Sequence, residues 1–152
     1  MENVGIRALE TGDLAEAAPL LASLNPDTPP SLVAERLHRI LDEHPHYRLI
    51  GAFTGGKLAG VAGGWIATKI WCGRYLEIDN LVVHENHRSS GMGSLLIRHL
   101  VDVAEEADCK VVVLDSYTSN HPSHRLYYRL GFEVWGYHFV KPIGDWKGDR
   151  SF

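Results

Sequence analysis

A short stretch with two glycines, an arginine and three serines has the composition of an anion-binding turn. It reads His87-Arg88-Ser89-Ser90-Gly91-Met92-Gly93-Ser94 and lies between the apolar run Leu81–Val83 and a helical pattern. Backbone amides in the first turn of a helix have no intrahelical acceptors, and the helix dipole adds positive potential there. Gly91 and Gly93 leave room for a phosphate near those amides, Arg88 offers a charged fork, and Ser90 or Ser94 offers a hydroxyl. The spacing predicts a diphosphate site, with an ordinary tight turn as the alternative.

Two well-known nucleotide loops are excluded by the same residues. The dinucleotide-binding pattern requires a third glycine three residues after Gly93, and that position is Leu96. No Gly-Lys-Ser or Gly-Lys-Thr is present, so the turn is not a Walker loop.

Two carboxylates, Glu77 and Asp79, precede this turn in the run Leu76-Glu77-Ile78-Asp79-Asn80-Leu81. Strand alternation predicts both on one face, with the apolar Leu76, Ile78 and Val82 on the core face. A carboxylate facing a cleft is suited to removing a proton from a substrate. Alternatively, both are solvated charges, or one pairs with Arg74 or Arg88.

The elements around these residues predict an α+β fold in the order β-α-α-β-β-β-α-β-α-β. Hydrophobic periodicity, together with the hairpin signal Gly55-Gly56, gives three antiparallel strands in a meander. Pro19 predicts a kink or early stop in the first helix, and Ser31 a cap for the second. The expected strands are Val4–Leu9, Tyr47–Phe53, Leu58–Thr68, Tyr75–Val83, Lys110–Leu114 and Phe132–Lys141; the expected helices are 13–24, from 31 onward, 92–107 and 123–130.

Composition restricts the class of protein. The 152 residues fit a single domain, 1–152, with 143–152 as a tail, and no apolar run is long enough to span a membrane. A net charge of −4 disfavours a nucleic-acid partner. Two cysteines make neither a disulfide framework nor a metal pattern, and the His pairs lack further ligands. We expect a cytoplasmic protein without a metal.

A second motif, Asn120 to Phe132, combines with the first into a family pattern. The chain resembles the GNAT superfamily of N-acetyltransferases, which carry Arg/Gln-x-x-Gly-x-Gly/Ala at the start of the central helix. These proteins commonly continue with an asparagine, a small residue, Leu/Phe-Tyr and Gly-Phe. In this chain the matching residues are Arg88-Ser89-Ser90-Gly91-Met92-Gly93, Asn120, Ser123, Leu126-Tyr127 and Gly131-Phe132. The resemblance covers the chain from the first strand to Lys141.

The resemblance implies a mixed, mostly antiparallel sheet with a splayed parallel strand pair, and acetyl-CoA as the acetyl donor. Its pantetheine arm would pair with backbone groups in the gap between those strands, and its pyrophosphate would lie in the glycine turn. Glu77 looks like the family's catalytic base, with Asp79 second, and Tyr127 like the acid near the thioester sulfur. The cofactor-binding residues implied are Leu81, Val82, Val83, Arg88, Ser89, Ser90, Gly91, Met92, Gly93, Ser94, Asn120 and Tyr127.

The acceptor is predicted only as a primary amine of a small molecule or peptide, because no motif in the sequence specifies it further. Acidic Glu43, Glu77 and Asp79 favour a cationic amine. Two alternatives remain: a non-catalytic acyl-CoA-binding module, and a toxin-like aminoacyl-tRNA acetyltransferase, which the net charge disfavours. A water chain in place of a fixed base, a capping role for Asn120, and a homodimer also remain open.

Overall fold

The computed structural model describes residues 3–146 and 148. Contacts divide the chain into an N-terminal unit, residues 1–114, and a C-terminal unit, residues 115–152. The N-terminal unit holds the sheet and the glycine turn, and the C-terminal unit holds the Asn120–Phe132 motif. Each unit is therefore described separately.

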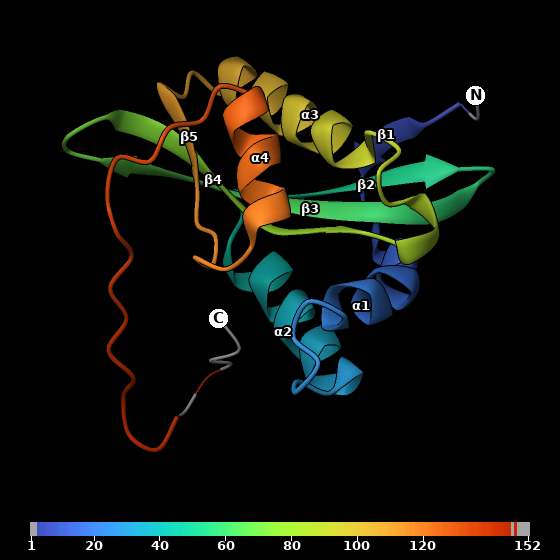
Figure 1. Cartoon of the computed structure of the whole chain (residues 1–152). Coiled ribbons are helices and arrows are strands. Elements are labelled where there is room, and N and C mark those ends of the chain that lie inside the picture. Colours follow the sequence, from blue (N-terminus) through green and yellow to red (C-terminus); the bar gives the residue numbers. More distant parts are fainter. Residues whose placement is uncertain (1–2, 147, 149–152) are drawn as a thin grey trace. The chain divides into compact units, whose positions relative to one another are not determined.

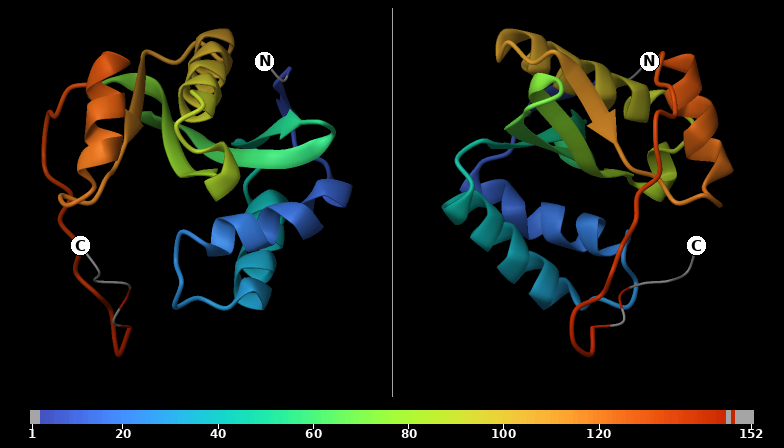
Figure 2. Two further views of the ribbon diagram at one scale, coloured as in Figure 1. Left: turned by 45° about the vertical axis from the view of Figure 1, so that its right-hand side comes forward. Right: turned by 90° about the vertical axis from the view of Figure 1, so that its left-hand side faces the viewer.

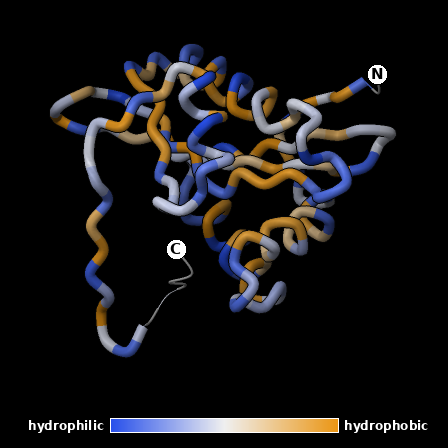
Figure 3. The backbone as a smooth tube through the Cα atoms, viewed as in Figure 1, coloured by the Kyte–Doolittle hydropathy of each residue, from blue (hydrophilic) through white to orange (hydrophobic). Residues whose placement is uncertain are grey.

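A five-stranded sheet in the order β1-β2-β3-β4-β5 forms the centre of the N-terminal unit. Neighbouring strands are antiparallel except for β4 and β5, which are parallel. Hydrophobic residues predominate along the central strands, which are the most deeply buried (Figure 3). The α+β class and the meander are thereby confirmed. The strands are β1 Gly5–Ala8, β2 Tyr47–Thr54, β3 Lys57–Lys69, β4 Gly73–Val83 and β5 Val111–Leu114.

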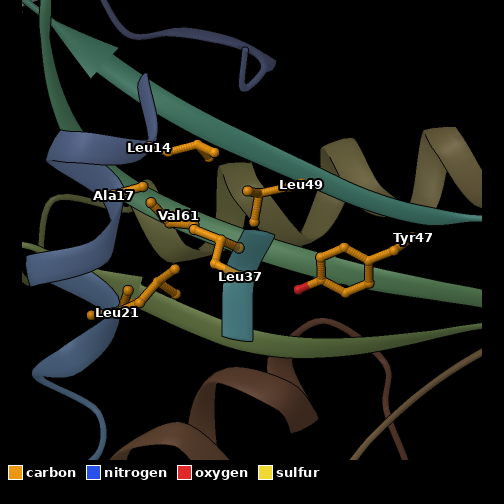
Figure 4. Packing of buried hydrophobic residues seen from close by; sticks show 8 residues of the cluster. Leu14, Ala17, Leu21, Leu37, Tyr47, Leu49 and Val61 are labelled. Carbon is orange, nitrogen blue, oxygen red and sulfur yellow. The ribbon is translucent and has the colours of Figure 1, made fainter. Parts of the chain in front are cut away.

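Helices cover both faces of this sheet (Figures 1 and 2). On one face α1 and α2 pack on a cluster that includes Leu14, Leu37, Tyr47, Leu49 and Val61 (Figure 4). On the opposite face α3 packs against β3 and β4, with Leu96 and Leu100 fully buried. The helical elements are η1 Thr11–Asp13, α1 Leu14–Ala22, α2 Pro30–Glu43, η2 Glu85–His87 and α3 Met92–Glu106.

Two details of the first helices differ from the sequence prediction. Pro19 does not stop α1, which continues to Ala22 because buried residues on both sides of the proline, Ala17 and Leu21 among them, hold it to the core. Ser31 is not the cap of α2. That helix begins one residue earlier, at Pro30, whose fixed φ and missing N–H suit the first helical position.

A bulge in β4 reverses the predicted alternation of its side chains. Asn80 has a φ of +53°, and the β3–β4 register shifts between Val61 and Gly63. Up to this point the prediction is correct, because Leu76 and Ile78 are buried. Beyond it Val82 packs with the α1/α2 cluster rather than on the face of Ile78, so its predicted face was wrong. An extra residue in one strand moves every later side chain to the other face.

The C-terminal unit contains α4, His121–Arg129, which ends as predicted before Gly131. The expected strand Phe132–Lys141 is wrong, because no strand is assigned within the described part of this segment. A strand requires a neighbour for its backbone groups, and alternation of aromatic residues alone does not provide one. Trp135, Tyr137 and Phe139 are accordingly exposed. Among the described residues no helix is long and apolar enough to cross a membrane.

Candidate active site

The glycine turn forms an open cradle at the start of α3. Gly91 occupies the N-cap position with a φ of +82°, a left-handed conformation that glycine adopts without strain. A Cβ added there would meet no atom within 4 Å, so the space above the helix end is open. Arg88 and Ser89 are exposed beside it, while the Ser90 hydroxyl donates to the His87 carbonyl and braces the turn. The donors and the space suit a phosphate group.

The parallel pairing of β4 with β5 ends before β4 reaches this cradle. Pairing runs from Tyr75 opposite Val111 to Ile78 opposite Leu114, where β5 ends. β4 continues to Val83, and within the described residues no strand pairs with its last part on the side of β5. The parallel pairing therefore ends immediately after Ile78, and the last part of β4 is left without a neighbouring strand on this side among the described residues.

A cavity of about 470 Å³ lies on the α1/α2 face of the sheet. Its walls come from the end of α2 and from the facing parts of β3 and β4. Two carboxylates, Glu43 and Glu77, line it, and among the described lining residues there is no lysine or arginine. The remaining walls are His44, Pro45, His46, Tyr47, Trp65, Ile66, Ala67 and Tyr75. A cavity with aromatic walls and acidic groups suits a cationic ligand.

The partly buried carboxylate of Asp79 holds two of these aromatic walls in place. Asp79 accepts hydrogen bonds from the Tyr47 hydroxyl at 2.8 Å and from the Trp65 indole N–H at 2.7 Å. The bulge turns Asn80 to the same side, where its amide donates to the Tyr47 oxygen at 3.2 Å. Tyr47 reaches Asp79 by crossing over Gly63, where any side chain would collide with its hydroxyl. We call these residues, Tyr47, Trp65, Asp79 and Asn80, the Asp79 clamp.

Known proteins resemble this chain over most of its length. The model of the Acetyltransferase (GNAT) family matches residues 17–132. The N-alpha-acetyltransferase RimI of Mycobacterium tuberculosis is 32% identical over 132 residues, which are 87% of this chain and 80% of that protein. The chain belongs to the GNAT acetyltransferase family. A Bacillus subtilis protein, named only provisionally as a ribosomal protein bS18-alanine N-acetyltransferase, is 29% identical over 65% of this chain.

The match to that Bacillus protein spans 62% of its length, less than two thirds. Among solved structures, an aminoglycoside N-acetyltransferase in complex with CoA superimposes with a TM-score of 0.84 at 20% identity. The superposition covers 94% of this chain and 96% of that one, and it confirms the GNAT fold.

The N-terminal unit contains most of the residues of the predicted GNAT site. Glu77 lines the cavity, and Asp79 lies behind the aromatic walls with both oxygens engaged. Leu81, Val82 and Val83 lie beyond the last pair of β4 with β5, and residues 88–94 form the cradle. Asn120 and Tyr127 belong to the C-terminal unit. Among the described residues no cluster of three or more His, Cys, Asp or Glu could hold a metal ion.

In the C-terminal unit the two tyrosines of α4 differ in their surroundings. Tyr127 is partly buried beside Phe132, and burial raises the pKa of its phenol. Tyr128 is exposed. Asn120 occupies the N-cap position of α4 without a side-chain capping bond, so the structure shows no such capping role for it.

Sequence reasoning missed Tyr47, His44 and His46 as cavity residues. The signal for Tyr47 was available in the pair Gly63-Gly64 inside an otherwise regular strand. Glycine in a strand interior often marks the close approach of another group. Here that group is the Tyr47 phenol, two strands away from the carboxylate it binds.

We expect Asp79→Asn to change how stability depends on pH. Burial raises the pKa of Asp79, partly offset by the hydrogen bonds from Trp65 and Tyr47. The native state therefore keeps this proton at pH values where the unfolded chain has lost it, and stability falls as pH rises between the unfolded and native pKa values. Asparagine cannot ionise, so the stability of the variant relative to the parent should improve with rising pH.

Urea unfolding at several pH values from about 4 to about 8 measures this difference. Asp27→Asn, on an exposed loop, is the control. A variant–parent difference that stays constant through this range would contradict the raised pKa.

Proposed function

We propose that the chain is an acetyl-CoA-dependent N-acetyltransferase acting on a cationic primary amine. The observation that carries the proposal is the position of Glu77. It lines the acidic cavity and lies one residue before β5 stops pairing with β4. An amine in the cavity and a thioester in the splayed gap would therefore meet beside its carboxylate. A cytoplasmic location and a homodimer remain predictions from the sequence.

The residues of the cradle and the gap fit acetyl-CoA. The pyrophosphate needs exposed N–H donors and a cation, which the start of α3 and Arg88 offer around an open Gly91. The pantetheine arm needs backbone partners, for which we propose Leu81 and Val83 on the unpaired side of β4. Bound acetyl-CoA supplies the activated acetyl group. RimI and the aminoglycoside enzyme, both named N-acetyltransferases, support this assignment.

Acetyl transfer to an alkylamine requires that the amine lose a proton. A free alkylamine has a pKa near 10.4, so deprotonation at neutral pH costs roughly 4–5 kcal/mol. We assign Glu77 as the base, because it lines the cavity, and Asp79 as the second candidate. Tyr127 is the proposed acid, because its place in the Asn120–Phe132 motif resembles that of the family's tyrosine and a phenol carries its proton at neutral pH.

The cofactor assignment is tested with Gly91→Asn. Asparagine tolerates the left-handed conformation, and no neighbouring atom would contact its Cβ. Its side chain would nevertheless occupy the space of the phosphate, so the Kd for acetyl-CoA should rise by about tenfold or more. Acetyl-CoA at about 100 times its Kd should stabilise the parent by roughly 2.7 kcal/mol, and this stabilisation should shrink in the variant. Thermal melts with and without acetyl-CoA measure it.

The matched control is Gly56→Asn, because Gly56 has a similar φ of +77° and lies in the β2–β3 turn. It should keep the full stabilisation by acetyl-CoA. If acetyl-CoA did not stabilise the parent protein, both the assignment of acetyl-CoA as cofactor and the assignment of the chain as an enzyme would be wrong. Binding without turnover of any amine would instead identify an acyl-CoA-binding module.

A further inference from the structure

The hairpin that forms one side of the cavity continues beyond it to an exposed apolar tip. Ala67 and Tyr75 are paired across β3 and β4 and both line the cavity. Three residues further, Ile70 is fully exposed, and Trp71 keeps 60% of its surface exposed. β2 does not support this part, since its pairing with β3 ends at Trp65 opposite Tyr47. Figure 1 shows the hairpin projecting from the sheet.

Charge changes sign between the cavity and the tip. Strand pairing places Trp65, Ala67 and Lys69 on the same face as Glu77 and Tyr75. The Lys69 ammonium lies 4.7 Å from the centre of the Tyr75 ring, which confirms that it turns toward the cavity side. Arg74 belongs to the opposite face, where its guanidinium donates to the Ala107 carbonyl at 3.1 Å, so among the described hairpin residues Lys69 alone supplies the cation on this face. A ligand lying along this face would meet carboxylates first, then a cation, then two apolar side chains.

We infer that the acceptor is a polypeptide whose terminal amine enters the cavity and whose following residues lie along the hairpin to Ile70 and Trp71. This inference rests on the proposed N-acetyltransferase function. It specifies an anionic side chain opposite Lys69, followed by apolar residues at the tip. The acidic cavity retains the cationic amine, and the basic end of the hairpin orients the chain that follows it.

Distances along the strands set the length of such an acceptor. The Trp65–Glu77 pair lies four residues from the Lys69–Gly73 pair, which is about 13 Å at roughly 3.3 Å per residue. An extended peptide advances by about the same amount per residue. Its fifth residue would therefore lie at Lys69, and its sixth and seventh at the tip. A single amino acid or amino sugar is too short to reach either.

The test compares acceptors that share the amine and differ in length and charge. The short probe is X-amide, where X is an equimolar mixture of amino acids other than cysteine. The long probe is X-Ala-Ala-Ala-Glu-Leu-Leu-amide, and the reversed probe is X-Ala-Ala-Ala-Arg-Ser-Ser-amide. Release of CoA, with mass spectrometry of the products, gives kcat/KM for the full chain on each probe. We expect the long probe to exceed the other two by at least about tenfold, or about 1.4 kcal/mol.

Variants locate this preference on the hairpin. Ile70→Ser/Trp71→Ser should remove the advantage of the long probe through KM and leave kcat/KM for X-amide within about twofold. Lys69→Ala should reduce the preference for the acidic over the reversed probe. The controls are Lys57→Ala, at the β2–β3 hairpin, and Leu24→Ser, a partly exposed leucine in the loop after α1. Neither should alter the preference.

The outcomes separate this inference from the proposed function. Equal kcat/KM of the parent on the short and long probes would overturn the inference. So would an equal fall in kcat/KM on both probes in Ile70→Ser/Trp71→Ser. Turnover of spermidine but of no peptide would overturn it and leave the N-acetyltransferase assignment intact. If the parent bound phosphatidylserine vesicles, and Ile70→Ser/Trp71→Ser lost that binding but kept the preference for the long probe, the tip would be a membrane contact and the inference would be overturned. No turnover of any amine would remove the proposed function itself.

Discussion

Glu77→Gln is expected to lower kcat/KM for acetyl transfer at neutral pH by about 10²-fold or more. Glutamine keeps the shape of glutamate but cannot accept the proton that the ammonium group must lose. Glu77 lines the cavity, and it is paired with Val113, one residue before the β4–β5 pairing ends. Of the acidic groups that line the cavity, it is the one on β4. Steady-state kinetics on the best amine measures the effect.

The pH profile distinguishes a lost base from a damaged site. As pH approaches the pKa of the amine, near 10.4, more of the amine is already deprotonated in solution. The difference in kcat/KM between Glu77→Gln and the parent should therefore become smaller. Glu43→Gln is the matched control, because Glu43 lines the same cavity from the end of α2 and is paired with Arg39. That change should raise KM for the cationic acceptor with little effect on kcat. Undiminished turnover by Glu77→Gln at every pH would leave Asp79 or a water chain as the base.

The sequence predicted the parts of the fold that depend on local pattern. Periodicity placed the β2–β4 meander and α3 to within a few residues, because each buries a regular apolar face, and the continuous apolar run 111–114 placed β5. The cradle was predicted for a similar reason, since the glycines at a strand-to-helix junction express a local backbone requirement. Gly91 indeed adopts a left-handed conformation at the start of α3.

Features that depend on distant residues were not predictable in this way. The bulge at Asn80 moved Val82 to the α1/α2 face against simple alternation, and no local pattern marks it. The exposed segment after Phe132 alternates like a strand, yet pairing depends on a neighbour that a local pattern does not specify. The Asp79 clamp joins three strands, so no single segment contains its pattern.

Gly63→Ala is expected to destabilise the protein by about 2–3 kcal/mol, more than an ordinary glycine-to-alanine change in a strand. A Cβ at this position would overlap the Tyr47 hydroxyl and lie 2.5 Å from the Asp79 carboxylate oxygen. Either β3 moves away from its neighbours, or Tyr47 rotates and its hydroxyl no longer donates to the partly buried Asp79 carboxylate. For a chain of this size the Tm should fall by roughly 5–10 °C.

A double-mutant cycle attributes this loss to the clamp rather than to the strand. In a Tyr47→Phe background the hydroxyl is absent, so Gly63→Ala should cost less than it does in the parent, although the ring still limits the recovery. Gly5→Ala is the control, because a Cβ on that strand residue meets no atom within 4 Å. Equal costs at Gly63 and Gly5 would mean that Tyr47 does not cross the sheet at Gly63. The KM for the amine should rise in Gly63→Ala as well, since the rings of Tyr47 and Trp65 that wall the cavity are held by the same carboxylate.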